Sequence, residues 1–285
     1  RTSSSAASDV YKRQTQQRVK VWENSETLWT DAIEKYPDNV NNVRLSYGQR
    51  GNYYRTEADK PERRAEQNDL RAKAIADYNK SLEANAKNHE VITNRGILYR
   101  NLAKQQADGN QRMEMMRLAV KDFNRALKIK PDYQNAYNSR GNVYFDYTAN
   151  GLTHYADSAL ADYNKSLELE SRDANTLANR GAIYVMKQQF GLAVNDLTEA
   201  INIDPGFVNA YSNRAIAYQR MGNLDAAIAD FTTSIGLNPT ASLYNTRGEM
   251  YQKQGKHNEA IQDFSNALQL VPNSAYSLRM RANSY

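Results

Sequence analysis

Arginine and aspartate return at matched places along the chain, and together they can form ion pairs or bind phosphate. Each arginine stands one residue before a glycine or alanine that recurs with a period of about 34 residues. Because guanidinium and carboxylate bond bidentately when partly buried, we predict one structural pair per repeat. An arginine ladder for phosphate or nucleic acid is the alternative. The predicted pairs are Arg50–Asp77, Arg95–Asp122, Arg140–Asp162, Arg180–Asp196, Arg214–Asp230 and Arg247–Asp263.

Asparagine recurs in the same register, where an amide could donate to and accept from a peptide backbone. Asparagine is a poor residue for a helix interior, so its recurrence there needs a reason. We interpret Asn135, Asn175 and Asn209, which come at the start of the expected helices, as caps. Six others predict a peptide-binding groove, with solvated polar filler as the alternative: Asn52, Asn94, Asn142, Asn179, Asn213 and Asn245.

Other chemistry finds little support in the sequence. There is no cysteine, and the three histidines, His89, His154 and His257, are far apart, so we expect no metal site. The sequence contains no phosphate loop, no G-x-S-x-G and no H-E-x-x-H. We therefore predict that this stretch is not an enzyme and needs no cofactor. The glycosylation sequons at Asn79 and Asn164 fall in predicted helices and are interpreted as chance matches.

The first 14 residues are interpreted as foreign to the protein. Residues 4–14 resemble the in-frame translation of a transposase adapter used in sequencing libraries. Without residues 1–14 the formal charge falls from +5 to +3, which is too small to predict a nucleic-acid partner. The chain would then be a fragment whose natural beginning lies upstream. The mean hydropathy of -0.82 and the lack of a long apolar run exclude a membrane helix within this stretch.

These residues must be positioned by repeated helical hairpins. Apolar positions at i, i+4 and i+7 predict an amphipathic first helix, and alanine followed four residues later by an aromatic residue or leucine predicts a second. The small residue after each arginine would let the two helices approach closely. We place a half-repeat and linker at 15–43, six repeats at 44–88, 89–133, 134–173, 174–207, 208–240 and 241–274, and a truncated seventh at 275–285.

This pattern resembles the tetratricopeptide family. The small residue, the tyrosine three residues later, the alanine of the second helix and a closing proline all recur at the family's spacing over residues 22–285. The resemblance implies an all-α, right-handed superhelical solenoid of antiparallel helix pairs, with a concave wall that binds protein partners. The groove asparagines resemble the ladder by which some members hold a peptide backbone.

Three repeats are longer than the others, at 45, 45 and 40 residues, and the additions fall between their two helices. Two additions of 11 residues are close to three helical turns, so each helix pair could lengthen without turning its apolar stripe from the core. We predict protruding hairpins with tips at 59–61 and 108–110, and a more irregular third near Asn150. A disordered surface loop is the alternative.

Residues 21–37 resemble the junction in bacterial membrane proteins that join a mannosyltransferase-like membrane region to a tetratricopeptide tail. This resemblance implies a membrane anchor upstream and a tail outside the inner membrane; without it, a cytoplasmic location is expected. Our main prediction is a non-catalytic scaffold that binds an extended peptide or partner helix. The alternatives are an extracytoplasmic accessory tail of a glycosyltransferase-like protein and a helical-repeat RNA binder.

Overall fold

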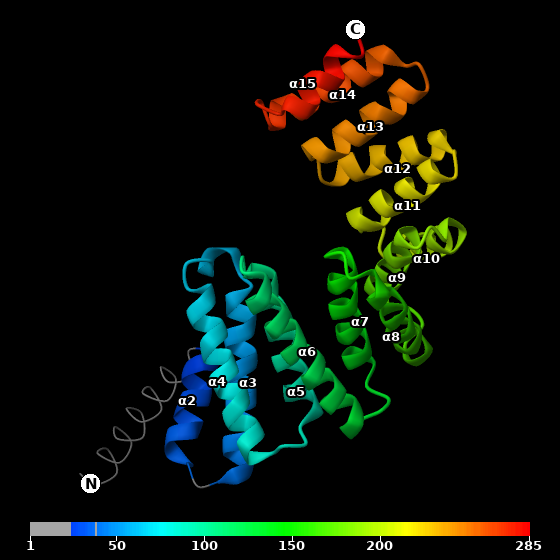
Figure 1. Cartoon of the computed structure of the whole chain (residues 1–285). Helices are drawn as coiled ribbons and strands as arrows, with labels where there is room; N and C mark the ends of the chain where they lie inside the picture. Colours follow the sequence, from blue (N-terminus) through cyan, green and yellow to red (C-terminus); the bar gives the residue numbers. More distant parts are fainter. Residues whose placement is uncertain (1–23, 38) are drawn as a thin grey trace, which may run out of the picture. The chain divides into compact units, whose positions relative to one another are not determined.

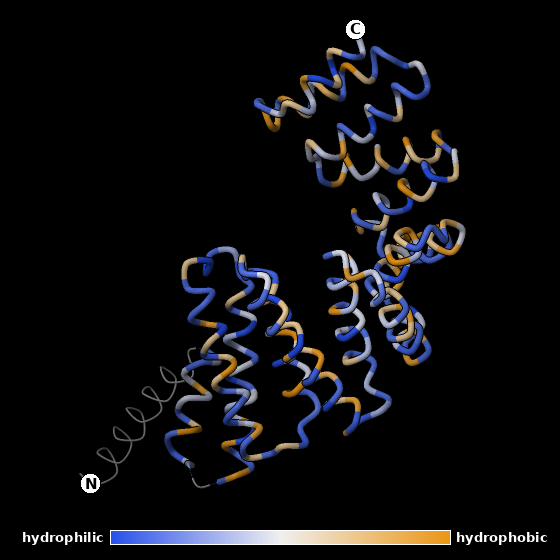
Figure 2. The backbone as a smooth tube through the Cα atoms, viewed as in Figure 1, coloured by the Kyte–Doolittle hydropathy of each residue, from blue (hydrophilic) through white to orange (hydrophobic). Residues whose placement is uncertain are grey.

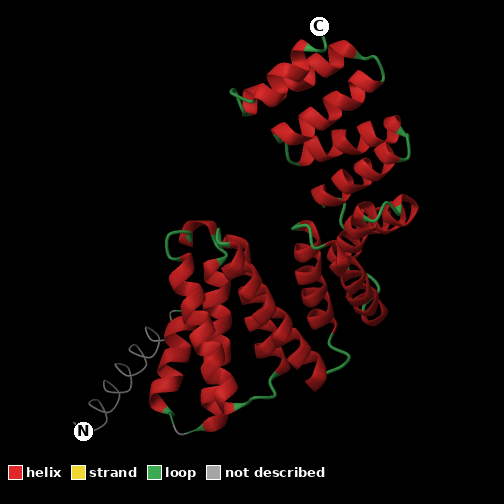
Figure 3. Ribbon diagram, in the orientation of Figure 1, coloured by secondary structure: helices red, strands yellow, loops and turns green. Residues whose placement is uncertain are grey.

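The computed structural model describes residues 24–37 and 39–285, so the predicted adapter segment and Trp22 lie outside its described part. The described residues form fourteen α-helices and two short 3-10 helices, joined by turns and loops, and they contain no strand (Figure 3). Hydrophobic and hydrophilic residues alternate along the helices (Figure 2). None of the helices in the described residues combines the length and apolar character that a bilayer crossing requires. The predicted all-helical fold is confirmed.

The chain divides into two compact units at residue 143, within helix α7 (Gln134–Ala149) (Figure 1). In unit 1, α3 packs on α4 and α5 on α6 as two hairpins, while α2 packs on α3 and α4 on α5. Helix α3 begins four residues before the repeat start predicted at residue 44, so part of the expected linker is helical. The elements before α7 are α2 (Ser25–Lys35), α3 (Val40–Ala58), η1 (Pro61–Arg63), α4 (Gln67–Ala84), α5 (His89–Gln105) and α6 (Gly109–Ile129).

Unit 2 repeats the hairpin with shorter helices. Helix α9 packs on α10, α11 on α12 and α13 on α14, and each second helix packs on the first helix of the next repeat. The first helices α9 and α11 also contact each other, so they form a common wall. The elements after α7 are η2 (Thr153–Tyr155), α8 (Ala156–Leu169), α9 (Ala174–Met186), α10 (Phe190–Ile203), α11 (Val208–Arg220), α12 (Leu224–Leu237), α13 (Ala241–Lys253), α14 (His257–Leu270) and α15 (Ala275–Ala282).

Short polar side chains begin several helices, and prolines follow their ends. Asp108 caps α6 by accepting from the Gln111 amide at 2.8 Å. Proline stands two residues after the last residue of five second helices, where it prevents continuation. These five prolines are Pro37, Pro131, Pro205, Pro239 and Pro272.

Glycine on the first helix makes room for a large side chain on the second, as the sequence predicts. A Cβ added at Gly96 would lie 2.8 Å from the ring of Phe123, which is fully buried. At Gly181 the nearest atom would be Cγ of Leu197, at 2.7 Å. These separations are below van der Waals contact, so in these two hairpins the helices could not pack this closely around a larger residue.

The long repeats extend their helices rather than adding a loop. Helices α3, α4, α5 and α6 have 19, 18, 17 and 21 residues, whereas α9 to α14 have 13 or 14. Near the two tips of unit 1, the last residue of α5 bonds the first residue of α4: Gln105 Nε2 donates to Gln67 Oε1 at 2.5 Å. The third addition is irregular, with η2 and Gly151 at a φ of +92°. The predicted lengthening of the first two hairpins by helix, and the irregular third addition, are confirmed.

Candidate functional site

Arginine and aspartate form bidentate ion pairs inside the hairpins. In repeat five, Arg214 donates from Nε and Nη2 to the two carboxylate oxygens of Asp230, both at 2.8 Å. The hydrogen bond to this carboxylate raises the pKa of Arg214 above its ordinary value. The same two-pronged contact joins Arg50–Asp77, Arg95–Asp122, Arg180–Asp196 and Arg247–Asp263. The pair of Arg140 with Asp162 stays a prediction.

Each arginine also donates to the preceding repeat, a contact that the sequence analysis missed. Nη1 of Arg214 donates to Thr198 Oγ1 at 2.9 Å, so one guanidinium joins three helices. A polar residue two positions after each aspartate was the signal that could have revealed this contact. The same position accepts from the other arginines at Asn79, Asn124, Asn164 and Thr232, at 2.5–2.9 Å. Thr30, two residues after Leu28 in the half-repeat, accepts from Arg50 at 3.0 Å.

At least one tyrosine on the same helix lies beside each guanidinium. The Arg214 guanidinium carbon lies 5.7 Å from the ring centre of Tyr211 and 5.9 Å from that of Tyr218, within cation–π range. Its side chain is only 15% exposed. The guanidinium of Arg214 therefore donates to Asp230 and Thr198 and packs between two rings. Few of its N–H groups are left to bind a phosphate ligand.

The sequons at Asn79 and Asn164 follow from the same architecture. Both asparagines accept a hydrogen bond from the arginine of the next repeat. The serines two residues later, Ser81 and Ser166, are fully buried, and Ser81 donates to the Arg44 carbonyl at 2.8 Å. Two structural positions therefore generate the Asn-x-Ser pattern.

In unit 1 the candidate asparagines satisfy a buried tyrosine. Tyr78 is fully buried and donates from its hydroxyl to Asn52 Oδ1 at 2.8 Å. The same oxygen accepts from Asn94 Nδ2 at 2.9 Å. Asn52 and Asn94 thus belong to an internal network, which accounts for amides at these positions without a ligand.

Burial raises the pKa of Tyr78 from 10.0 to about 12. A raised pKa in the folded protein keeps the phenol neutral, so its contribution to stability is complete below pH 10.0 and is lost as the pH rises to about 12. We expect Tyr78→Phe to lose less stability over this window than the wild type, in urea unfolding at a series of pH values. Equal losses in the two proteins would show that Tyr78 ionises normally.

Two further candidate asparagines also have partners within the chain. Asn142 Nδ2 donates to Asn138 Oδ1, four residues earlier, at 2.9 Å. Asn245 Oδ1 accepts from Ser277 Oγ, on α15, at 2.9 Å. These contacts join neighbouring turns or neighbouring repeats.

Unit 2 places asparagines on the shared wall of α9 and α11. Asn213 on α11 is half-buried, and its side chain makes no hydrogen bond to any described residue. Asn209, one turn earlier, is exposed, as is Asn175 on α9, one turn before the half-buried Asn179. Figure 1 shows α9 and α11 in consecutive hairpins. These four residues, Asn175, Asn179, Asn209 and Asn213, are named the amide face.

The interpretation of Asn175 and Asn209 as helix caps is wrong. Helix α9 is capped by Asp173, whose carboxylate accepts from the Thr176 amide at 3.3 Å. Helix α11 begins after Phe207 and has no side-chain cap. Asn175 and Asn209 are instead the second residues of their helices, so capping does not explain them.

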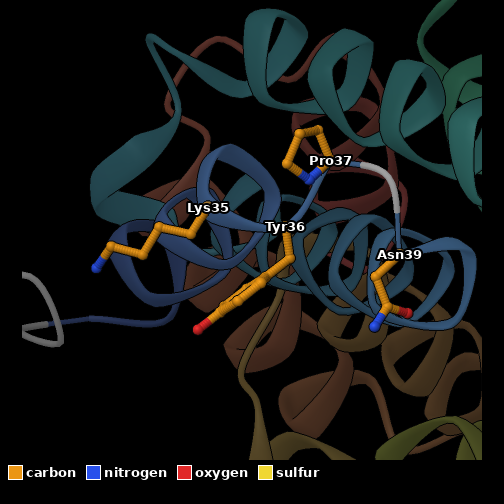
Figure 4. A pocket seen from close by; sticks show the side chains of 4 residues that line it. All are labelled: Lys35, Tyr36, Pro37 and Asn39. Atoms are coloured by element: carbon orange, nitrogen blue, oxygen red, sulfur yellow. The ribbon is translucent and has the colours of Figure 1, made fainter.

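A shallow pocket lies at the turn between α2 and α3, where Lys35, Tyr36, Pro37 and Asn39 line it (Figure 4). Lys35 is paired with Asp31 at 2.6 Å, and Asn39 caps α3 by accepting from Asn42 at 3.0 Å. Its charged and amide groups are therefore committed to local contacts. No cluster of three or more metal-ligating side chains occurs among the residues that the structure describes.

Part of the chain matches known repeats in sequence. Residues 208–240 and 241–274 match a family model described as the tetratricopeptide repeat, and residues 181–222 match one described as a TPR repeat. No curated protein matches the chain. The tetratricopeptide repeats predicted from the sequence are thus confirmed over residues 181–274.

Solved structures extend the similarity to the whole fold. A tetratricopeptide repeat protein from Parabacteroides merdae is 22% identical, with a TM-score of 0.57 over 95% of both chains. PilW, a type IV pilus biogenesis factor, is 20% identical, with a TM-score of 0.63 over 80% of this chain and 97% of its own. YrrB, described as a TPR protein with an unusual peptide-binding site, is 19% identical, with a TM-score of 0.55 over 72% and 97%. These likenesses show the solenoid fold.

Proposed function

We propose that the chain is a non-catalytic scaffold that binds an extended peptide of a protein partner along the amide face of unit 2. The observation that carries this proposal is Asn213, a half-buried amide with no hydrogen-bond partner in the described chain. A polar group that is partly withdrawn from water gains most from a ligand that supplies the missing bond. An extended peptide supplies such groups at every residue.

The chemistry of the amide face suits a peptide backbone. Each asparagine offers one acceptor and two donor hydrogens, which complement a backbone carbonyl and amide together. Asn209 and Asn213 are one turn apart, so both lie on the same side of α11. The face consists of neutral amides, so we expect a ligand recognised by its main chain rather than by its charge.

Relatives of the same fold support this class of function. YrrB is described as having a peptide-binding site, and it is similar to 72% of this chain. The proposal also agrees with the state of the arginines, because their guanidiniums are occupied by aspartate. The neutral amides are therefore the polar groups on the first helices that remain available to a ligand.

The test uses peptides selected from a displayed random library by the wild-type chain. We expect the triple variant Asn175→Ala, Asn209→Ala and Asn213→Ala to bind the selected peptides about 100-fold more weakly, at about 1 kcal/mol for each lost hydrogen bond. Affinity would be measured by fluorescence anisotropy of labelled peptides. Asn258→Ala, an exposed asparagine on α14, is the matched control and should leave the affinity unchanged.

Selected peptides that bind the triple variant as tightly as the wild type would remove the amide face from the proposal. Circular dichroism of the variants would show that the helices are retained.

Two alternatives remain predictions. The accessory tail of a membrane glycosyltransferase-like protein rests on the resemblance of residues 21–37, and the hydropathy of the reading frame upstream of residue 15 would test it. The RNA binder predicts salt-sensitive association with homopolymeric RNA. The paired arginines argue against it, since they have few donors left for phosphate.

A further inference from the structure

Helix α6 carries four cations on neighbouring turns: Arg117, Lys121, Arg125 and Lys128. At 100° per residue, the first, second and fourth of these lie within about 40° of one another around the helix. Arg117, Lys121 and Lys128 are exposed, and Arg125 is half-buried. These four residues are named the basic row. At 1.5 Å per residue it is about 16 Å long.

The basic row belongs to one repeat only. At the same four positions, the second helix of every other full repeat carries at most one cation. The corresponding residues are Ala72, Ala76, Lys80 and Glu83 on α4; Asp157, Ala161, Lys165 and Glu168 on α8; Gly191, Asn195, Glu199 and Asn202 on α10; Asp225, Ala229, Thr233 and Gly236 on α12; and Asn258, Gln262, Asn266 and Gln269 on α14.

Lysines elsewhere at these positions are neutralised within their own helix. Lys80 pairs with Glu83 at 3.0 Å, and Lys165 pairs with Glu168 at 2.7 Å. Lys121 and Lys128 have no carboxylate within salt-bridge distance among the described residues. The neighbour of Arg117 is Glu114, at 3.6 Å, with both side chains more than half exposed.

Like charges one turn apart oppose helix formation. Arg117 and Lys121 are four residues apart, as are Lys121 and Arg125, and like charges at this spacing destabilise a helix. Helix α6 therefore retains a repulsion that a ligand with negative charge would relieve. Arg125 also donates to the Ala86 carbonyl, which brings the exposed Lys87 close to the basic row.

We propose that the basic row binds an acidic segment of a protein, at a site separate from the amide face. A ligand that matches it must be narrow, because the row is confined to α6: the same positions of α4 are Ala72, Ala76 and the internally neutralised Lys80 and Glu83. A bilayer or a nucleic-acid duplex presents charge across a plane or around a wide rod, whereas an acidic helix presents it along a line. No aromatic residue belongs to the row, so the stacking that single-stranded nucleic acid uses is lacking.

The test measures binding of the whole chain to a labelled, helix-forming peptide with glutamates at i, i+4, i+8 and i+11. We expect salt-sensitive binding, no binding of the matching glutamine peptide, and about tenfold weaker binding by the double variant Lys121→Gln, Lys128→Gln. The double variant Lys80→Gln, Lys165→Gln removes the same charge from paired sites and should bind like the wild type.

Vesicles of phosphatidylcholine with phosphatidylglycerol, and a single-stranded oligothymidine, serve as the competing anions. Association of either with the wild type, lost in Lys121→Gln, Lys128→Gln while the glutamate peptide does not bind, would overturn the proposal. So would equal binding of the glutamate and glutamine peptides.

The peptides selected by the amide face should bind the variant Lys121→Gln, Lys128→Gln normally. Failure of the basic-row proposal is therefore distinguishable from failure of the proposed function. The variant should also be at least as stable as the wild type, because a repulsion is removed.

Discussion

Asp230→Ala should lower the free energy of unfolding of unit 2 by about 3–5 kcal/mol, because it leaves the charge of Arg214 largely buried and unpaired. The Asp230 side chain is 9% exposed and that of Arg214 is 15% exposed, so water cannot fully replace the lost carboxylate. Asp230 also fixes the guanidinium that donates to Thr198, on the preceding hairpin. Urea denaturation followed by circular dichroism would measure the change.

The matched control is Asp157→Ala, which removes an ion pair with Lys187 in which the aspartate is 80% exposed. This change should cost less than about 1 kcal/mol. The double variant Arg214→Leu, Asp230→Leu removes both charges and should recover most of the stability lost in Asp230→Ala. A double variant as unstable as the single one would show that the charge left behind is not the cause.

Gly96→Ala should destabilise unit 1 by about 1–3 kcal/mol, the usual cost of overpacking, although alanine is the better helix former. The new Cβ would lie 2.8, 3.0 and 3.2 Å from three ring atoms of Phe123, and that ring is fully enclosed. The hairpin of α5 and α6 would have to open along its length. Thermal and urea unfolding would both report the loss.

Gly236→Ala provides the comparison, since nothing lies within 4 Å of the Cβ that it adds to α12. It should raise stability by up to about 1 kcal/mol through helix propensity alone. The wild-type chain has alanine at the equivalent of Gly96 in repeat five, where Ala215 and Phe231 are both buried. Unchanged or increased stability of Gly96→Ala would mean that Phe123 can shift to make room for alanine, and would contradict the prediction.

Periodicity made the hairpins and the ion pairs predictable. In every full repeat the arginine stands directly before the small residue, and the aspartate stands three residues after the alanine of the second helix, whatever the length of the repeat. Such fixed positions are expected of an ion pair that must fit between two helices. The inserted helices were predictable because 11 residues preserve the helical phase, so the core stripe stays aligned.

The roles of individual amides were harder to predict, because asparagine serves any position that needs a donor and an acceptor. Asn52 accepts from the hydroxyl of Tyr78, and the need for it arises from a tyrosine on another helix. Asn213 stands at the position of Asn94, which donates to Asn52, but the side chain of Asn213 has no such partner among the described residues. Only the packing of the second helix distinguishes an amide that completes the core from one that is available to a ligand.

The side-chain amide signals of asparagine, followed by nuclear magnetic resonance during titration with a selected peptide, test the central claim most directly. We predict that the signals of Asn175, Asn209 and Asn213 shift with saturation, while those of Asn52 and Asn94 do not, because the latter are held by Tyr78 and by each other. Saturating shifts confined to Asn52 and Asn94, or to residues of the second helices, would contradict the account.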